Sequence, residues 1–421
     1  MSEKRVPFSL EQVNALAKNH PTPFYIYDEE NLRGNIRRLN DAFSWCEGFR
    51  NYFAVKACPN PEIMSILKEE GAGIDCSSMT ELILSEALGF KGEEIMFTSN
   101  DTPLEEFQKA VEMGAVINLD DISHIQSLDN INYQGDFACF RYNPGNLRGG
   151  NAIIGEPVEA KYGVPDHTIV EAYQLMKDRG AKRFGLHTML ISNELNEDYF
   201  VETAEMIFEL VKRISDVLNI QFEFVNLGGG IGIPYRPEEE AMDVKSIGER
   251  TQALHKQFIV DQGLKPLTVY LECGRFISGP SGYLVSKVRH VTEKYKKYVG
   301  LDACMTNLMR PALYGAYHHI TVLGKEQEAR NETYDVTGSL CENNDKFAIN
   351  RNLPKVRPGD ILAIHDAGAH GHAMGFNYNG TLRSAEFLMR TDGRFEMIRR
   401  AETARDYFAT LNFPGNKWSV F

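Results

Sequence analysis

The stretch YFAVKA, residues 52–57, is an apolar run that ends beside a single cation, Lys56. Its aromatic and β-branched residues predict a buried strand. An ammonium is costly to bury, so this lysine should be paired, deprotonated or chemically engaged. A desolvated amine is also an effective nucleophile in Schiff-base chemistry. From this stretch alone, a salt-bridged or snorkelling lysine is the alternative.

Strand-like and helix-like segments alternate from residue 50 onward. The expected strands are 50–57, 73–78, 94–99, 116–120, 137–142, 184–190, 222–228 and 267–272, and the expected helices include 60–70, 103–113, 168–180, 197–217 and 241–262. This α/β alternation predicts a (β/α)8 TIM-like barrel over residues 33–279. A doubly wound sheet is the alternative, because periodicity does not show closure. Residues 143–166 are expected to form a long loop, of a kind that is often functional.

The pattern changes after about residue 280. The segments there are short, β-branched and separated by turn residues; they are 282–290, 332–339, 360–366 and 383–389. Few helical patterns interrupt them, which predicts a C-terminal all-β domain, a sandwich or barrel. We expect the early strand-like run 23–28 to join it, so that this domain comprises residues 1–32 and 280–421.

The composition narrows the class of protein. The chain has 421 residues and is 43% hydrophobic, enough for more than one domain. Its net charge of −13 argues against nucleic acid or anionic membrane as a partner. Seven cysteines without CxxC pairs indicate a reducing compartment. No stretch has the ~20 apolar residues of a membrane helix, and residues 1–7 lack a signal-peptide core. We therefore expect a cytoplasmic protein.

Polar residues and glycines gather at the expected C-terminal ends of the barrel strands, where the active site of such a barrel lies. They are Lys56, Asp75, Arg141, His187, Ser192, Gly228, Gly229, Gly230, Glu272, Gly274 and Arg275. Consecutive glycines let backbone N–H groups approach an anion, so residues 228–230 predict a phosphate site, with a flexible turn as the alternative. A carboxylate at Glu272 could keep a pyridinium nitrogen protonated, or pair structurally with Arg275.

The β domain contains two further motifs. Cys341 and Glu342 lie together in an expected turn, and Arg310 and Tyr314 offer a guanidinium beside a phenol. The histidines between residues 365 and 372 invite a metal site, but their glycine-rich context favours a turn. We predict no metal.

Together these motifs resemble the fold-type III pyridoxal-phosphate decarboxylases, and most closely their diaminopimelate decarboxylase branch. The resemblance spans nearly the whole chain. It rests on FAVKA (53–57), DCSSMTEL (75–82), NLGGGIG (226–232) with Pro234 and Tyr235, ECGR (272–275), RPALY (310–314), CENND (341–345), DAGA (366–369) and NYN (377–379).

The resemblance implies a role for each of these positions. Lys56 would hold pyridoxal 5′-phosphate covalently, and Cys341 would protonate the reacting carbon. The other cofactor-binding residues would be Asp75, Arg141, His187, Ser192, Gly228, Gly229, Gly230, Glu272, Gly274, Arg275 and Tyr378. Substrate would contact Arg275, Arg310, Tyr314, Glu342 and Tyr378. The family also implies a homodimer in which the partner chain donates Cys341 and Glu342.

Strand six departs from the family pattern, in which a second histidine stacks on the cofactor ring. Here that position is Met189, and the following glycine is Ile191. Methionine can also pack on an aromatic face, so Met189 or His187 is expected to cover the ring. His370 stands where the family usually has tyrosine.

The implied reaction is α-decarboxylation of meso-2,6-diaminopimelate to L-lysine, the last step of lysine biosynthesis. The far end of this substrate carries an ammonium and a carboxylate, which fit Glu342 and the pair Arg275 and Arg310. Ornithine, lysine or a carboxylated polyamine precursor stays open as substrate. A non-catalytic pyridoxal-phosphate protein would lack the β domain, and a racemase of this fold would have arginine at Glu272.

Overall fold

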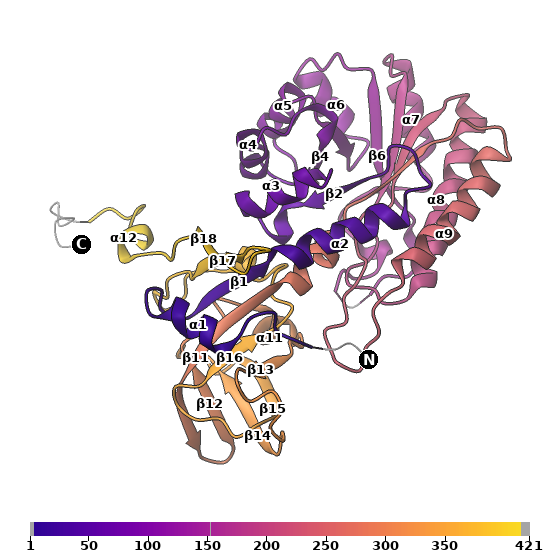
Figure 1. Ribbon diagram of the computed structural model, residues 1–421. Helices are drawn as coiled ribbons and strands as arrows, with labels where there is room; N and C mark the ends of the chain where they lie inside the picture. The colour runs from indigo at the N-terminus through magenta and orange to yellow at the C-terminus, as the bar shows by residue number, and fades with distance from the viewer. Residues whose placement is uncertain (1–3, 152, 414–421) are drawn as a thin grey trace. The chain divides into compact units, whose positions relative to one another are not determined.

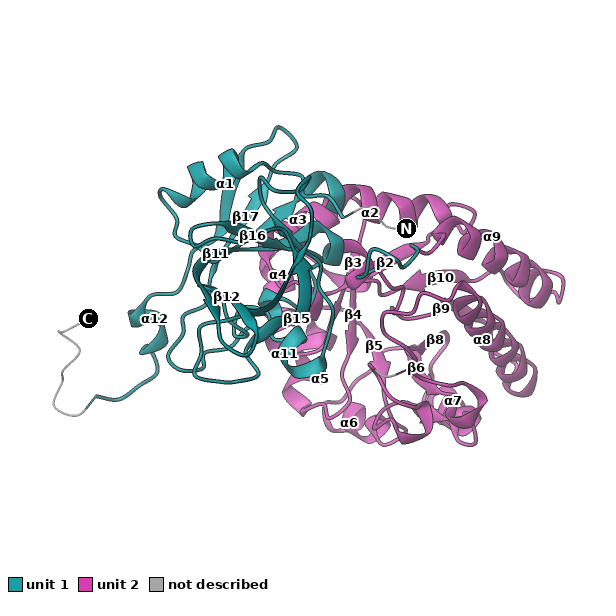
Figure 2. Ribbon diagram, turned by 90° about the horizontal axis from the view of Figure 1, so that it is seen from below, with its two compact units in different colours: residues 1–32, 234–240, 278–421 teal, residues 33–233, 241–277 magenta. Residues whose placement is uncertain are grey.

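The computed structural model describes residues 4–151 and 153–413, which form two compact units. The first unit contains residues up to 32, 234–240 and 278 onward, and the second contains residues 33–233 and 241–277. Figure 2 colours the first unit teal and the second magenta.

The second unit is a closed barrel of parallel strands. The strands are β2 (Arg50–Ala54), β3 (Gly73–Cys76), β4 (Ile95–Thr98), β5 (Val116–Leu119), β6 (Phe137–Asn143), β8 (Arg183–Thr188), β9 (Phe222–Asn226) and β10 (Thr268–Leu271). Pairing of β10 with β2 and of β5 with β6 closes the ring. The predicted (β/α)8 barrel is therefore confirmed, and the doubly wound alternative is wrong.

Helices follow the barrel strands around the outside of the ring (Figure 1). They are α3 (Pro61–Glu69), α4 (Met79–Ala87), α5 (Leu104–Glu112), α6 (His124–Asn130), α7 (Ile169–Asp178), α8 (Glu197–Leu218) and α9 (Val244–His255). Local sequence defines their ends. Asn60 caps α3 ahead of Pro61, and Asn196 caps α8 by accepting the Asp198 N–H at 3.0 Å. Asn219 ends α8 in the left-handed conformation.

Short elements complete this unit. They are η1 (Val55–Ala57), η2 (Gly92–Glu94), η3 (Gly145–Leu147), η4 (Pro157–Glu159), β7 (Val164–Pro165) and the π-turn Lys256–Val260. After the end of β6, the elements in the described residues of the expected loop 143–166 are η3, η4 and β7. Asn143 holds its two halves together, because its side-chain amide donates to the carbonyls of Pro157 and Tyr162 at 2.9 and 3.0 Å.

The first unit is built on mixed β-sheet. Its strands are β1 (Phe24–Asp28), β11 (Gly282–Glu293), β12 (Lys297–Leu301), β13 (Ile320–Val322), β14 (Glu332–Thr337), β15 (Lys346–Leu353), β16 (Ile361–Ile364), β17 (Ala385–Met389) and β18 (Phe395–Arg399). Strand β1 pairs antiparallel with β11 and parallel with β17. The N-terminal strand thus joins the β domain as predicted. Helical segments here are α1 (Leu10–Ala17), α11 (Arg310–Tyr314), α12 (Ala404–Tyr407), η6 (Gly279–Ser281) and η7 (His372–Met374). Helices α2 (Glu29–Ala42) and α10 (Arg275–Ser278) span the unit boundaries.

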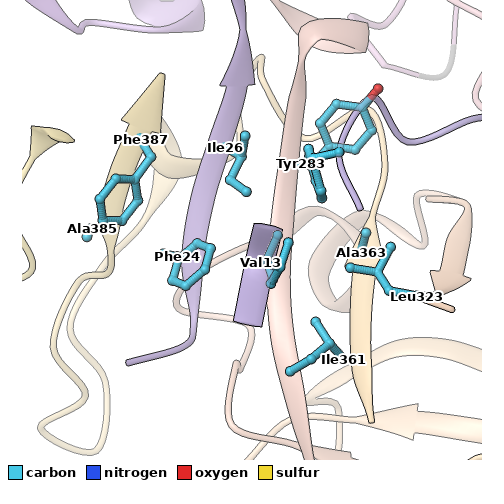
Figure 3. Packing of buried hydrophobic residues seen from close by; sticks show 11 residues of the cluster. Val13, Phe24, Ile26, Tyr283, Leu323, Ile361, Ala363, Ala385 and Phe387 are labelled. Atoms are coloured by element: carbon cyan, nitrogen blue, oxygen red, sulfur yellow. The ribbon is translucent and has the colours of Figure 1, made fainter. Parts of the chain in front are cut away.

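The core of the first unit lies beside β1 (Figure 3). Phe24 and Ile26 of β1 are fully buried, and the Phe24 ring meets the Phe387 ring edge to face at 5.3 Å. Val13 of α1 and Val285 of β11 pack into the same cluster. Such aromatic contacts add to the free energy of burial, so β1 holds the sheet together from its centre.

Among the described residues, no helix combines the length and apolarity needed to span a bilayer.

We expect Phe24→Ala to lower the free energy of unfolding by about 3–5 kcal/mol, because it leaves a cavity between β1 and β17. Chemical denaturation measures this change. The matched control is Ile349→Ala, since Ile349 is 61% exposed on β15. Equal losses in the two variants would contradict this description of the core.

Candidate active site

The centre of the barrel site is the carboxylate of Glu272, directly after β10. It is buried, and it accepts hydrogen bonds from Asn226 Nδ2 at 2.8 Å and His187 Nε2 at 3.1 Å. These donors come from β9 and β8, whose register places His187 opposite Asn226. Burial acts to raise the pKa of Glu272, but the charge and hydrogen bond of His187, helped by Lys56 and Arg141, leave that pKa below its usual value. Glu272 is therefore an anion at neutral pH.

The loop after β9 brings backbone N–H groups to the same end of the barrel. Gly228 has a positive φ of 72°, and a Cβ there would lie 2.3 Å from the Thr188 carbonyl oxygen. Only glycine fits without displacing β8. A Cβ on Gly229 would similarly lie 2.6 Å from the carbonyl oxygen of Glu272. The residues 228–230 thus form a close-packed turn.

Met189 lies against this glycine turn. Its Sδ accepts the Gly229 N–H at 3.2 Å. A thioether is a weak acceptor, so an anionic oxygen would compete well for this N–H. Nearby, Arg275 Nη2 donates to Ser192 Oγ at 3.3 Å, which ties the start of α10 to the segment after β8. Ser192 and Arg275 are therefore brought together, and Met189 borders the glycine turn.

The structure corrects the predicted burial of Lys56. The chain leaves β2 at Ala54 and turns through η1, so Lys56 lies beyond the strand and its side chain is exposed. It still interacts electrostatically with three carboxylates, those of Asp75, Glu81 and Glu272. The amine is accessible and surrounded by acids instead of being desolvated.

Asp75 is a buried carboxyl on β3 that interacts electrostatically with Lys56. Burial, followed by the charge of Glu272, raises the pKa of Asp75 well above its usual value. Thr98 donates to Asp75 Oδ1 at 2.8 Å, and Asn118 donates to Thr98 at 2.8 Å. The sequence analysis missed both residues, although they end expected strands as the other site residues do.

Arg141 lies on β6 beside Asp120, with 3.5 Å between Nη1 and Oδ1, and its guanidinium covers the Tyr162 ring at 3.8 Å. Tyr162 belongs to the long loop 143–166. Gly274 lies where the loop after β10 passes close to Ala57. The barrel therefore brings together all the strand-end residues predicted from the sequence.

The first unit holds Arg310 in a buried setting at the start of α11. Its Nη1 donates to Tyr235 Oη at 2.9 Å and lies 3.0 Å from His318 Nε2. Tyr314 ends the same helix and is 64% exposed, and Tyr378 is 46% exposed. Tyr235 comes from the excursion 234–240, and its place beside Arg310 was not predicted.

Cys341 and Glu342 lie in the turn between β14 and β15. Cys341 is exposed, and the turn is held by Asp345, which accepts the backbone N–H groups of Met305 and Leu340 at 2.6 and 2.9 Å. Asp345 is buried and belongs to the motif CENND. Its role in holding the turn depends on its contact with Met305, which is distant in the sequence. The predicted turn at Cys341 is therefore present, and its thiol is exposed.

No group of three or more potential metal ligands occurs among His, Cys, Asp and Glu in the described part of the chain. Two of the histidines between 365 and 372 make hydrogen-bond contacts within the protein. His365 Nε2 lies 2.8 Å from Thr321 Oγ1, and His372 Nε2 lies 3.0 Å from the Ser384 carbonyl oxygen.

The chain is similar to known proteins over most of its length. Residues 30–279 match the family model of the pyridoxal-binding domain of pyridoxal-dependent decarboxylases. The chain is 44% identical to Protein TabA of Pseudomonas amygdali pv. tabaci over 95% of this chain and 94% of that protein. It is 37% identical to diaminopimelate decarboxylase of Methanothermobacter thermautotrophicus, again over 95% and 94%. The crystal structure of M. jannaschii diaminopimelate decarboxylase with L-lysine superposes with a TM-score of 0.87, at 29% identity over 96% of this chain and 94% of that one.

The barrel residues fit pyridoxal phosphate on three structural grounds. The backbone N–H groups of the Gly228–Gly230 turn are of the kind that binds phosphate, and side chains on these residues would clash with neighbouring backbone. The ionised, buried Glu272 can oppose a protonated ring nitrogen. His187 Nδ1 is a buried polar atom that has no hydrogen-bond partner among the described residues. A polar ligand at the barrel mouth is therefore expected.

We expect Gly228→Ala to weaken pyridoxal-phosphate binding roughly tenfold or more, because a side chain there combines left-handed strain with the clash at Thr188. Absorbance titration of the apoprotein measures the affinity. Gly180→Ala is the matched control, since Gly180 also has positive φ, of 102°, but faces open space. Equal affinities for the two variants would contradict the fit.

Asp75 should make the apoprotein's stability depend on pH. Because its folded pKa is raised, the unfolding free energy contributed by Asp75 is lost as the pH rises above the ordinary value of 3.8. We therefore expect Asp75→Asn to gain stability relative to the parent chain between about pH 4 and neutrality. Denaturation at several pH values tests this, with the exposed Asp136→Asn as control. Parallel curves for parent and Asp75→Asn would refute it.

Proposed function

Because the chain belongs to the pyridoxal-dependent decarboxylase family, we propose that this amino-acid decarboxylase converts meso-2,6-diaminopimelate to L-lysine and carbon dioxide. The observation that carries the proposal is the buried Arg310, held by Tyr235 and His318 in the same unit as Glu342. Several relatives are named diaminopimelate decarboxylase, at up to 37% identity. The reaction would be the last step of lysine biosynthesis.

The substrate proposal rests on charge. The distal end of diaminopimelate carries a carboxylate and an ammonium, and so it needs a cation and an anion. Arg275 and Arg310, with Tyr314 and Tyr378, would bind the carboxylate, and Glu342 would bind the ammonium. Ornithine and lysine have only an ammonium there. Neither of them offers a distal carboxylate to the guanidinium of Arg310.

Pyridoxal phosphate supplies an electron sink for the electron pair that carbon dioxide leaves behind. Lys56 would hold the cofactor through its exposed amine, and the glycine turn with Arg275 would bind its phosphate. Glu272 would keep a proton on the ring nitrogen, an arrangement that its lowered pKa supports. His187 holds Glu272 in position, since its Nε2 donates to that carboxylate. Met189 would pack on the ring face in place of a histidine.

Proton return completes the reaction. Cys341 is exposed in a turn anchored by Asp345. There it would deliver the proton to the reacting carbon. By family resemblance, Cys341 and Glu342 would serve the site of a partner chain, which makes the enzyme a homodimer. All seven cysteines are free, which supports a cytoplasmic location.

A second candidate is decarboxylation of another diamino acid: ornithine, lysine or a carboxylated polyamine precursor. Two observations favour it. Met189 replaces the ring-stacking histidine, and the chain is 44% identical to a relative whose name states no substrate. A non-catalytic role in pyridoxal-phosphate binding is less consistent with the complete β unit.

A substrate panel tests the proposal. Carbon dioxide release from diaminopimelate, ornithine and lysine should be largest for diaminopimelate. Arg310→Met should lower its kcat/KM roughly 10- to 150-fold, the value of one charge-assisted hydrogen bond of about 1.5–3 kcal/mol. The exposed Arg289→Met is the control. Activity confined to ornithine would reject diaminopimelate as substrate.

Lys56→Ala should abolish turnover and covalent cofactor attachment. Borohydride reduction of the holoenzyme, followed by peptide mass spectrometry, should place the reduced pyridoxyl group on Lys56. Lys68→Ala serves as the matched control, since Lys68 lies on the following helix, α3. A label on another lysine would overturn the assignment.

A further inference from the structure

Lys4 joins two distant segments of the first unit. Its ammonium forms an ion pair with Asp366 Oδ2 at 2.6 Å and also donates to the carbonyl oxygen of Pro234. Asp366 lies just after β16, and Pro234 opens the excursion 234–240. The two charged side chains are only 9% and 6% exposed. Salt screens such a pair weakly, so it holds its segments more firmly than a surface ion pair does.

The same two segments hold the guanidinium of Arg310. Tyr235 of the excursion accepts from Arg310 Nη1 at 2.9 Å, and its ring centre lies 4.8 Å from the guanidinium carbon. His318 Nε2 lies 3.0 Å from the same nitrogen. His318 Nδ1 in turn lies 2.8 Å from the carbonyl oxygen of His365, the residue before Asp366. The neighbours of Arg310 therefore lead back to both segments that Lys4 joins.

The directions of these hydrogen bonds follow from the groups involved. A carbonyl oxygen only accepts, so His318 donates from Nδ1 to His365. A guanidinium only donates, so His318 Nε2 accepts from Arg310. Side-chain contacts and peptide bonds together form one closed ring. Its members, in order, are Lys4, Asp366, His365, His318, Arg310, Tyr235 and Pro234. A closed ring restricts each member, because none can shift without stretching a contact.

We propose that Lys4 is a positioning residue for Arg310, fixing the guanidinium where it binds the distal carboxylate of the substrate. The inference rests on the proposed function, in which Arg310 binds that carboxylate. A guanidinium and a carboxylate pair through two parallel hydrogen bonds, and both depend on the same orientation. Lys4 acts through the excursion and the segment after β16, and not by contact with the substrate.

Loss of Lys4 should leave the chain folded, because Asp366 can take up a proton. Burial raises the pKa of Asp366 to about 6, although the charge and hydrogen bond of Lys4 and the charge of Arg310 act to lower it. Without Lys4 that pKa should rise further, so that no buried charge stays unpaired near neutral pH. Lys4→Met therefore opens the ring while it keeps most of the side-chain volume.

The test measures substrate kinetics and product binding in the holoenzyme. L-Lysine bound as the product keeps the distal carboxylate of diaminopimelate, whereas cadaverine is the same diamine without a carboxylate. We expect Lys4→Met to raise the KM for diaminopimelate and to weaken L-lysine binding, each roughly tenfold, with kcat within about twofold of the parent. Cadaverine binding, measured like that of L-lysine by isothermal titration, should not change. Lys4→Arg should restore the parent values, and exposed Lys18→Met is the matched control.

A double variant shows whether Lys4 acts through Arg310. In the Arg310→Met background, Lys4→Met should weaken L-lysine binding no further, whereas a general loss of stability would act in both backgrounds. Additive losses, or an equal loss of cadaverine binding, would overturn the positioning role. Unchanged L-lysine affinity in Lys4→Met, with weaker binding in Arg310→Met, would overturn that role alone. Unchanged affinity in Arg310→Met would overturn the proposed binding of the distal carboxylate and, with it, the role of Lys4.

Discussion

The barrel site depends on keeping one carboxylate ionised out of water. An unpaired buried carboxylate costs several kcal/mol, and Glu272 avoids this cost because Asn226 and His187 both donate to it. Those donors are available only when β8, β9 and β10 pair in one register. A slip of one residue would turn both side chains to the opposite face of the sheet. The pairing of β8, β9 and β10 is therefore part of the barrel and also places the hydrogen-bond donors of Glu272.

The first unit supports its functional residues in a different way. Its core is a sheet built around β1, and the residues assigned to substrate and proton transfer lie at helix ends and turns. Asp345 shapes one such turn by binding two backbone N–H groups, and Tyr235 and His318 hold Arg310. Rigid sheet with side chains on connecting segments is a common way to present reactive groups.

Much of this architecture was predictable because apolar runs mark barrel strands. The runs 73–78, 116–120 and 222–228 each contain an observed strand, and glycines mark the turn after β9. The exposure of Lys56 was not predictable, since periodicity does not reveal that the chain leaves β2 at Ala54. Strand β15 carries polar residues that mask its pattern. The supporting roles of Asn118 and Tyr235 arise from contacts between distant segments, which no local pattern records.

The excursion 234–240 has a consequence for the architecture of the gene. The polypeptide passes from one unit to the other near residues 32, 233, 240 and 277. Neither unit is encoded by one uninterrupted stretch of codons. End-to-end joining of two ready-made genes therefore could not have produced this arrangement without later rearrangement, and no single proteolytic cut can release either body whole.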